Sequence, residues 1–266
     1  MREFRVTLTH RAGAYRLSGR FREAARHYSA ARRLFARAAS ASGLVHCSTW
    51  SAENYRGQGR FSLAGKMSAR AVELAEDFDA PDVRAWPLWN LGEVRKLQGR
   101  WDDALAHYRR ARELFSEAGN ASAVDWCLSS IADALRPTDA QAARDINFEA
   151  MRSARGAFSL SACWLNEGEY LRLNSQFADA IVAFRLGGSI PGEEALAGNA
   201  GRIGLQARLA ILECMRLCGK PRVADYERME RLAKANGSEW LCMRTRLGRF
   251  FAIWQKDGKA PQRLKA

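Results

Sequence analysis

Small and large apolar residues alternate at helical spacing between Leu88 and Leu114. Gly99 interrupts the stretch and divides it into two helical halves. The alternating positions are Leu91, Gly92, Trp101, Ala104, Tyr108, Ala111 and Leu114. This pattern predicts two helices that pack together by fitting large side chains over small ones.

The turn at Gly99 recurs along the chain at a constant interval. Gly-Arg-aromatic triplets begin at residues 19, 59 and 99, so both intervals are 40 residues. Glycine suits the left-handed position that ends a helix, and the aromatic residue begins the next helix. A constant interval of this length with helix-turn-helix content predicts stacked repeats rather than a globular bundle.

The small/large code resembles that of the tetratricopeptide repeat, whose usual period of about 34 residues is shorter. The resemblance implies an all-α fold: a right-handed α-α superhelix, or solenoid, of about six helix pairs plus a C-terminal closing helix. We expect one such unit over residues 1–256 and a mobile tail over 257–266. The expected repeats are 5–39, 45–79, 85–118, 122–154, 160–190 and 200–235, and the closing helix is 239–255.

Two segments depart from the code. In the fourth repeat Pro137 takes the place of the glycine turn, and the second helix fits either with Ile146 or with Ala143 and Ala150 facing inward. The fifth repeat ends in the glycine-rich segment 187–192. Such a segment is either a longer loop or a hinge.

In the tetratricopeptide family the first helix of each pair lines a concave groove, and aligning the turns transfers that expectation to this chain. Four first helices then carry an acid three residues before a base: Glu53 and Arg56, Glu93 and Lys96, Glu169 and Arg172, and Glu213 and Arg216. These are either ion pairs on a solvated face, worth about 0.2–0.5 kcal/mol each, or a ladder of charges that reads a peptide. The matching face of the fourth repeat, which is Val124, Cys127, Ile131 and Leu135, carries no charge.

Further candidates lie one turn earlier on the same helices: Thr49, Trp50, Trp86, Trp89, Asn90 and Asn166, with Arg16 on the matching face of the first repeat. In peptide-binding members of the family, asparagines on first helices hydrogen-bond the ligand's main chain. The resemblance therefore implies that Asn90 and Asn166 contact a peptide, beside an aromatic wall of Trp86 and Trp89. The alternative is that Trp89 packs on the neighbouring repeat and that the asparagines are solvated.

The net charge of +13 is concentrated at the two ends of the chain. Residues 1–60 carry 12 basic and 3 acidic side chains, and residues 201–266 carry 15 and 6. Basic ends attract an acidic protein or nucleic acid by long-range steering, or they are simply the solvated faces of arginine-rich helices. A further interpretation is an end-to-end dimer, in which two chains join through their first helices.

Catalytic, metal and membrane signatures are missing from the sequence. It has no phosphate-binding loop and no His-Glu-x-x-His motif, and its six cysteines form no Cys-x-x-Cys pair. No apolar run reaches the ~18–20 residues of a membrane span, and no signal sequence opens the chain. We therefore expect a cytoplasmic, non-catalytic adaptor or regulator without a cofactor, which binds a protein or peptide in its groove. The alternatives are a nucleic-acid-associated protein and a sensor of a small molecule or signal peptide.

Overall fold

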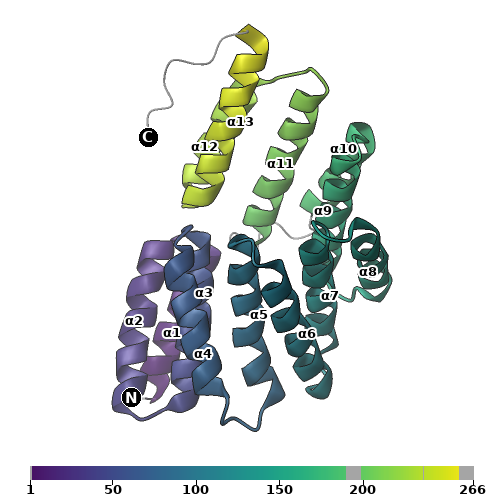
Figure 1. Cartoon of the computed structure of the whole chain (residues 1–266). Coiled ribbons are helices and arrows are strands. Elements are labelled where there is room, and N and C mark those ends of the chain that lie inside the picture. Colours follow the sequence, from purple (N-terminus) through teal and green to yellow (C-terminus); the bar gives the residue numbers. More distant parts are fainter. Residues whose placement is uncertain (1, 190–198, 236, 258–266) are drawn as a thin grey trace.

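The computed structural model describes residues 2–189, 199–235 and 237–257. Within these ranges the chain forms 13 helices and no strand, arranged as six antiparallel pairs and one further helix (Figure 1). The pairs are α1 (Arg2–Leu17) with α2 (Phe21–Arg37), α3 (Ala41–Gly57) with α4 (Phe61–Ala75), α5 (Pro81–Leu97) with α6 (Trp101–Glu117), α7 (Ala121–Leu135) with α8 (Ala140–Ser153), α9 (Ala157–Leu173) with α10 (Phe177–Gly188), and α11 (Asn199–Leu217) with α12 (Val223–Ala235), and α13 (Glu239–Asp257) follows them. Each helix packs against its neighbours in the chain, so the predicted α-solenoid is confirmed. Residues 258–266 of the predicted tail and residues 190–192 of the predicted hinge segment lie outside the described residues.

The repeated turn has the same hydrogen bonds wherever it occurs. Gly19 has a φ of 73°, and its N–H donates to the carbonyl of Arg16 at 3.1 Å, while the next N–H, of Arg20, donates to Tyr15 at 2.8 Å. Gly59, Gly99 and Gly219 repeat this conformation, with φ values of 78°, 74° and 75°. These two bonds satisfy the last carbonyls of the first helix, so the Gly-Arg-aromatic triplet ends one helix and positions the start of the next.

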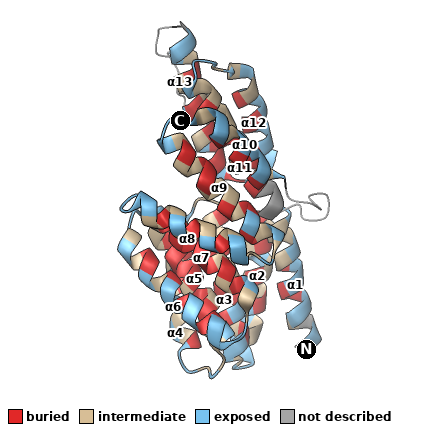
Figure 2. Ribbon diagram, turned by 90° about the vertical axis from the view of Figure 1, so that its right-hand side faces the viewer, coloured by how far each residue is buried: buried red, intermediate tan, exposed pale blue. Residues whose placement is uncertain are grey.

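In the third and fifth pairs a large side chain covers a glycine of the facing helix. A Cβ atom added to Gly92 would lie 2.6 Å from the ring of Tyr108, and one added to Gly168 would lie 2.6 Å from Phe184. Figure 2 shows the buried residues gathered where the helices meet and the exposed residues on the outside. Tyr108, Leu114 and Phe115 are completely buried in the largest core cluster, together with Ala104 and Ala111.

Gly92→Ala is expected to lower the free energy of unfolding by about 1–2 kcal/mol. The ring of Tyr108 is fully buried, and overpacking costs about 1–3 kcal/mol, of which the better helix propensity of alanine offsets up to ~1 kcal/mol. Gly13→Ala is the matched control, because its Cβ would lie 3.9 Å from its nearest neighbour. Urea denaturation should show that Gly13→Ala stabilises the protein; a stabilising Gly92→Ala would contradict the packing described.

The second helix of the fourth pair adopts the register with alanines inward. Ala143 and Ala150 are buried, whereas Ile146 is only partly buried. Asn147 stands where the third pair has Tyr108, and it is also buried; its side-chain amide donates to the carbonyl of Cys163 at 3.0 Å. The polar residue is tolerated there because its amide bonds to the next first helix.

The turn between α12 and α13 contacts the glycine turns at Gly19 and Gly59. A Cβ on Gly237 would lie 2.6 Å from the carbonyl oxygen of Gly19, and one on Gly59 would lie 3.6 Å from the backbone of Trp240. In Figure 1 the lower end of α12 and α13 accordingly faces the upper end of α1–α3. The superhelix therefore curves back on itself, so that its C-terminal helices α11–α13 cover its concave side. None of the described helices combines the length and apolarity of a membrane span.

Candidate functional site: a cavity lined by charges and aromatic rings

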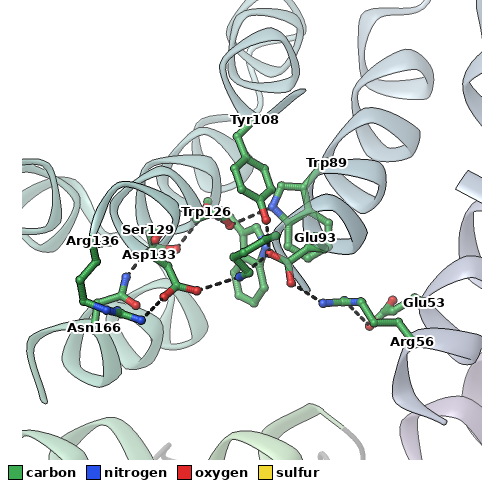
Figure 3. Close-up of polar contacts among 12 residues, drawn as sticks. Glu53, Arg56, Trp89, Glu93, Tyr108, Trp126, Ser129, Asp133, Arg136 and Asn166 are labelled. Atoms are coloured by element: carbon green, nitrogen blue, oxygen red, sulfur yellow. Dashed lines mark hydrogen bonds and ion pairs between the residues drawn. The ribbon is translucent and has the colours of Figure 1, made fainter. Parts of the chain in front are cut away.

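A row of charges crosses the concave side from one first helix to the next. Arg16 of α1 contacts Glu53 of α3 at 2.9 Å, and Arg56 of α3 contacts Glu93 of α5. Lys96 of α5 then contacts Asp133 of α7. Figure 3 shows Glu53, Arg56, Glu93, Asp133 and Arg136 of this row. The charge row consists of Arg16, Glu53, Arg56, Glu93, Lys96, Asp133 and Arg136.

Glu93 is the centre of this row. Its carboxylate accepts hydrogen bonds from the Tyr108 hydroxyl at 2.6 Å and from Lys96 Nζ at 3.0 Å, and it also contacts Arg56. Burial alone would raise the pKa of Glu93, but the charges of Lys96 and Arg56 and the Tyr108 hydrogen bond outweigh it and leave the pKa below its ordinary value. The glutamate is therefore ionised, and the i,i+3 pair predicted from the sequence is one link of a longer chain between repeats.

Asp133 and Arg136 correct the expectation that the fourth repeat carries no charge on this face. Asp133 Oδ2 lies 2.8 Å from Lys96 Nζ, and Asp133 Oδ1 lies 2.7 Å from the Arg136 guanidinium. Cys127 and Ile131 are instead buried in the core between helices. The 40-residue interval could have identified the missed pair, because residues 93 and 96 project directly onto 133 and 136.

Asp133→Asn is expected to cost about 1.5–3 kcal/mol of stability at pH 7, the range for hydrogen bonds to charged groups. Burial raises the pKa of Asp133, but Lys96 and Arg136 depress it more strongly, well below its usual range. The contribution is therefore present above the unfolded pKa of about 3.9 and is lost as the pH falls through the folded value. Urea denaturation at pH 7 and near pH 3 measures the free energies of unfolding of the wild-type protein and of Asp133→Asn. The difference between them should be smaller near pH 3, and a difference of constant size would contradict this account.

Aromatic rings form a second row beside the charges. Trp50 and Trp86 have ring centroids 5.9 Å apart, and Trp89 and Trp126 are 5.6 Å apart, so the contacts connect α3, α5 and α7. Trp89 is nearly buried and donates from Nε1 to Ser130 at 3.0 Å, while the Arg56 guanidinium lies 5.3 Å from its ring centroid. Trp89 thus packs on the neighbouring repeat, the alternative considered from the sequence, and it also lines the cavity described below.

Two predicted contact residues lie behind the cavity wall. Asn90 is buried, and its amide donates to the carbonyl of Trp86 at 3.3 Å. Thr49 is also buried, with its hydroxyl donating to the carbonyl of Val45. Asn166 differs, because it lines the cavity while its amide donates to the carbonyl of Ser129 at 2.9 Å. The face of Asn90 could not be assigned from the repeat alone, since a rotation of one residue moves a side chain by about 100°.

The predicted acid–base pairs of the fifth and sixth repeats make different contacts from one another. Glu169 pairs with Arg172 at 2.7 Å within α9, as the spacing predicts. Glu213 of α11 instead contacts Arg244 of α13 at 3.3 Å. Arg216 lies over the ring of Phe251, 5.5 Å from its centroid. Glu213 and Arg216, the last predicted pair, therefore each contact the closing helix α13.

A cavity of about 520 Å³ lies between the charge row and the C-terminal helices. Its polar lining is Arg56, Glu93, Lys96, Ser129, Ser130, Asp133, Arg136, Asn166, Glu169, Gln206, Ser238 and Arg244. Its apolar lining includes Phe61, Trp89, Trp101, Trp126, Leu165, Ile203 and Trp240. The residues from α11 and α13 were not predicted, because only the curvature of the solenoid brings them opposite α3, α5 and α7.

These features define a helical-repeat solenoid with a ligand-sized, partly open cavity on its concave side. The sequence profile of the tetratricopeptide repeat matches residues 44–117 and 83–156. Residues 44–156 therefore match tetratricopeptide repeats, and the helix pairs on either side continue the same repeat architecture. A comparison with curated protein sequences gave no match.

Solved structures with similar folds include members of the Rap proteins. A Rap protein complexed with competence and sporulation factor has a TM-score of 0.73 at 17% identity, covering 91% of this chain and 68% of that chain. The apo form of RapI has a TM-score of 0.61 at 10% identity, covering 95% and 97%. BtubC (BKLC) from P. vanneervenii has a TM-score of 0.52 at 16% identity, covering 94% and 96%. At these identities the similarity concerns the fold.

Proposed function

We propose that the protein is a non-catalytic regulator that binds a short peptide inside the cavity. The cavity carries the proposal, because its volume of about 520 Å³ falls in the range of ~300–1,000 Å³ that is typical of small-ligand sites. A folded domain is too large for such a space, whereas a few residues of extended peptide fit. The fold similarity to a Rap protein complexed with competence and sporulation factor supports the same interpretation.

The lining suits a peptide in both its polar and its apolar parts. Tryptophan rings offer flat surfaces for apolar side chains, and Asn166 and Gln206 offer amides that both donate and accept hydrogen bonds. Four cations and three carboxylates line the space: Arg56, Lys96, Arg136 and Arg244, with Glu93, Asp133 and Glu169. The surplus of one positive charge favours a peptide with a net negative charge or a free carboxylate.

Five buried free cysteines and one exposed cysteine are the state expected in a reducing compartment. We therefore assign the protein to the cytoplasm, where a short signalling peptide would reach it after import or release. This assignment agrees with the proposed regulatory role.

Selection from a displayed library of random short peptides tests the proposal. We expect enriched sequences to share a consensus and to bind saturably, with one peptide per protein in calorimetry. The proposal would be contradicted if the enriched sequences bound equally well to a variant whose cavity is blocked by a large side chain, such as Ala162→Trp.

A further inference from the structure

The closing helix α13 presents two apolar faces, of which only one is used. On the inner face Leu241, Thr245 and Ala252 are fully buried. On the opposite face Met243 is 64% exposed, and Leu247 and Trp254 are each 50% exposed. Large apolar side chains gathered on one exposed face mark an interaction surface more often than isolated ones do.

The spacing of the outer face indicates the shape of its partner. Met243, Leu247, Phe250 and Trp254 follow one another at intervals of four, three and four residues. This is the spacing by which one α-helix packs along another. We call these four residues the α13 stripe. An amphipathic helix that lies along α13 would cover it in the way that second helices cover first helices elsewhere in the fold.

Basic side chains flank the α13 stripe on both sides. Arg244 contacts Glu213 of α11, and Arg246 and Arg249 both contact Glu230 of α12, at 2.8 and 3.2 Å. Glu230 also forms an ion pair with Lys234 at 3.0 Å, so that its carboxylate is shared by Lys234, Arg246 and Arg249. The surface around the stripe therefore keeps an excess of positive charge, which favours an acidic partner.

A second copy of the chain is a poor occupant for the same reason. Residues 201–266 carry 15 basic and 6 acidic side chains, and residues 1–60 carry 12 and 3. Joining either basic end to the α13 stripe would bring like charges together. The charge distribution thus disfavours end-to-end assembly and favours a different protein.

We propose that the α13 stripe docks an amphipathic, acidic α-helix of a partner protein. This surface is separate from the cavity, so the protein has one site for a peptide and another for a helix. The stripe supplies the apolar contact, and Arg246 and Arg249, which do not line the cavity, supply attraction to acidic residues along the edge of the partner helix.

A pair of designed probe peptides tests the proposal. Both are about three heptads long with leucine at the a and d positions; one carries glutamate at the e and g positions and the other carries lysine. Fluorescence anisotropy at low salt should show the acidic peptide binding at least about tenfold more tightly, an advantage that added salt reduces. Leu247→Asp should abolish binding, whereas Leu186→Asp, which changes an equally exposed leucine of α10 (47%), should not.

Four results would overturn the proposal. Equal binding of the two peptides, or binding unchanged by Leu247→Asp, would show that the α13 stripe does not select an acidic helix. Sedimentation that reveals a dimer, converted to a monomer by Leu247→Asp, would assign the stripe to a second copy. Binding to vesicles that contain phosphatidylserine, lost in the same variant, would assign it to a membrane surface.

Discussion

Glu93→Ala is expected to lower the free energy of unfolding by about 3–5 kcal/mol, the range for breaking a buried ion pair from one side. The carboxylate is shared by Arg56, Lys96 and Tyr108. Its removal leaves two partly buried cations without this partner and takes away the acceptor of the buried tyrosine hydroxyl. Chemical denaturation followed by circular dichroism measures the loss directly.

An exposed ion pair of similar geometry provides the control. Arg110 contacts Glu113 at 2.7 Å on the outside of α6, with side chains 47% and 60% exposed. Glu113→Ala should cost less than about 1 kcal/mol, because exposed pairs are screened by solvent. If both variants lost the same small amount, the charge row would be only a series of solvated pairs.

Ala162→Trp is expected to weaken binding of a selected peptide by about 100-fold or more, a change of ~2.7 kcal/mol. Ala162 of α9 lines the cavity and is partly buried. An indole at this position would occupy space that a ligand needs, since ligands in such sites bury most of their surface. It leaves every ion pair of the charge row in place. Isothermal titration calorimetry measures the change in affinity.

Ala106→Trp is the matched control, because Ala106 is exposed on α6 and is not part of the cavity lining. The two variants introduce the same side chain into helices of the same length. Unchanged affinity in Ala106→Trp and lost affinity in Ala162→Trp would locate the peptide inside the cavity. Equal affinity in both would place it elsewhere.

The repeat architecture could be predicted from the sequence because its determinants are local. Glycine turns, the aromatic residue that follows each of them, and small residues opposite large ones all recur at 40-residue intervals. The weak point was the fourth repeat, where Pro137 obscures the turn and Asn147 replaces the large residue. Alignment to the apolar positions then concealed Asp133 and Arg136.

The cavity could be predicted only in part because it depends on long-range geometry. The charge row follows from residues that repeat along the chain, and its members were identified on three of the four first helices that it joins. Trp240 and Arg244 belong to the same cavity only because small inter-repeat rotations bring residues 237–240 back to Gly19 and Gly59. Such rotations depend on the packing of all repeats together, which leaves no periodic signal in the sequence.

Photo-crosslinking gives the most direct test of the central claim that the concave cavity binds a short peptide. A library-selected peptide carrying a photoreactive phenylalanine analogue is irradiated with the protein, and the crosslinked residues are mapped by mass spectrometry. The account predicts crosslinks on cavity-lining segments of α5, α7, α9 and α11, competed by unlabelled peptide and lost in Ala162→Trp. Crosslinks confined to α2 and α8, which contribute no residue to the cavity lining, would contradict it.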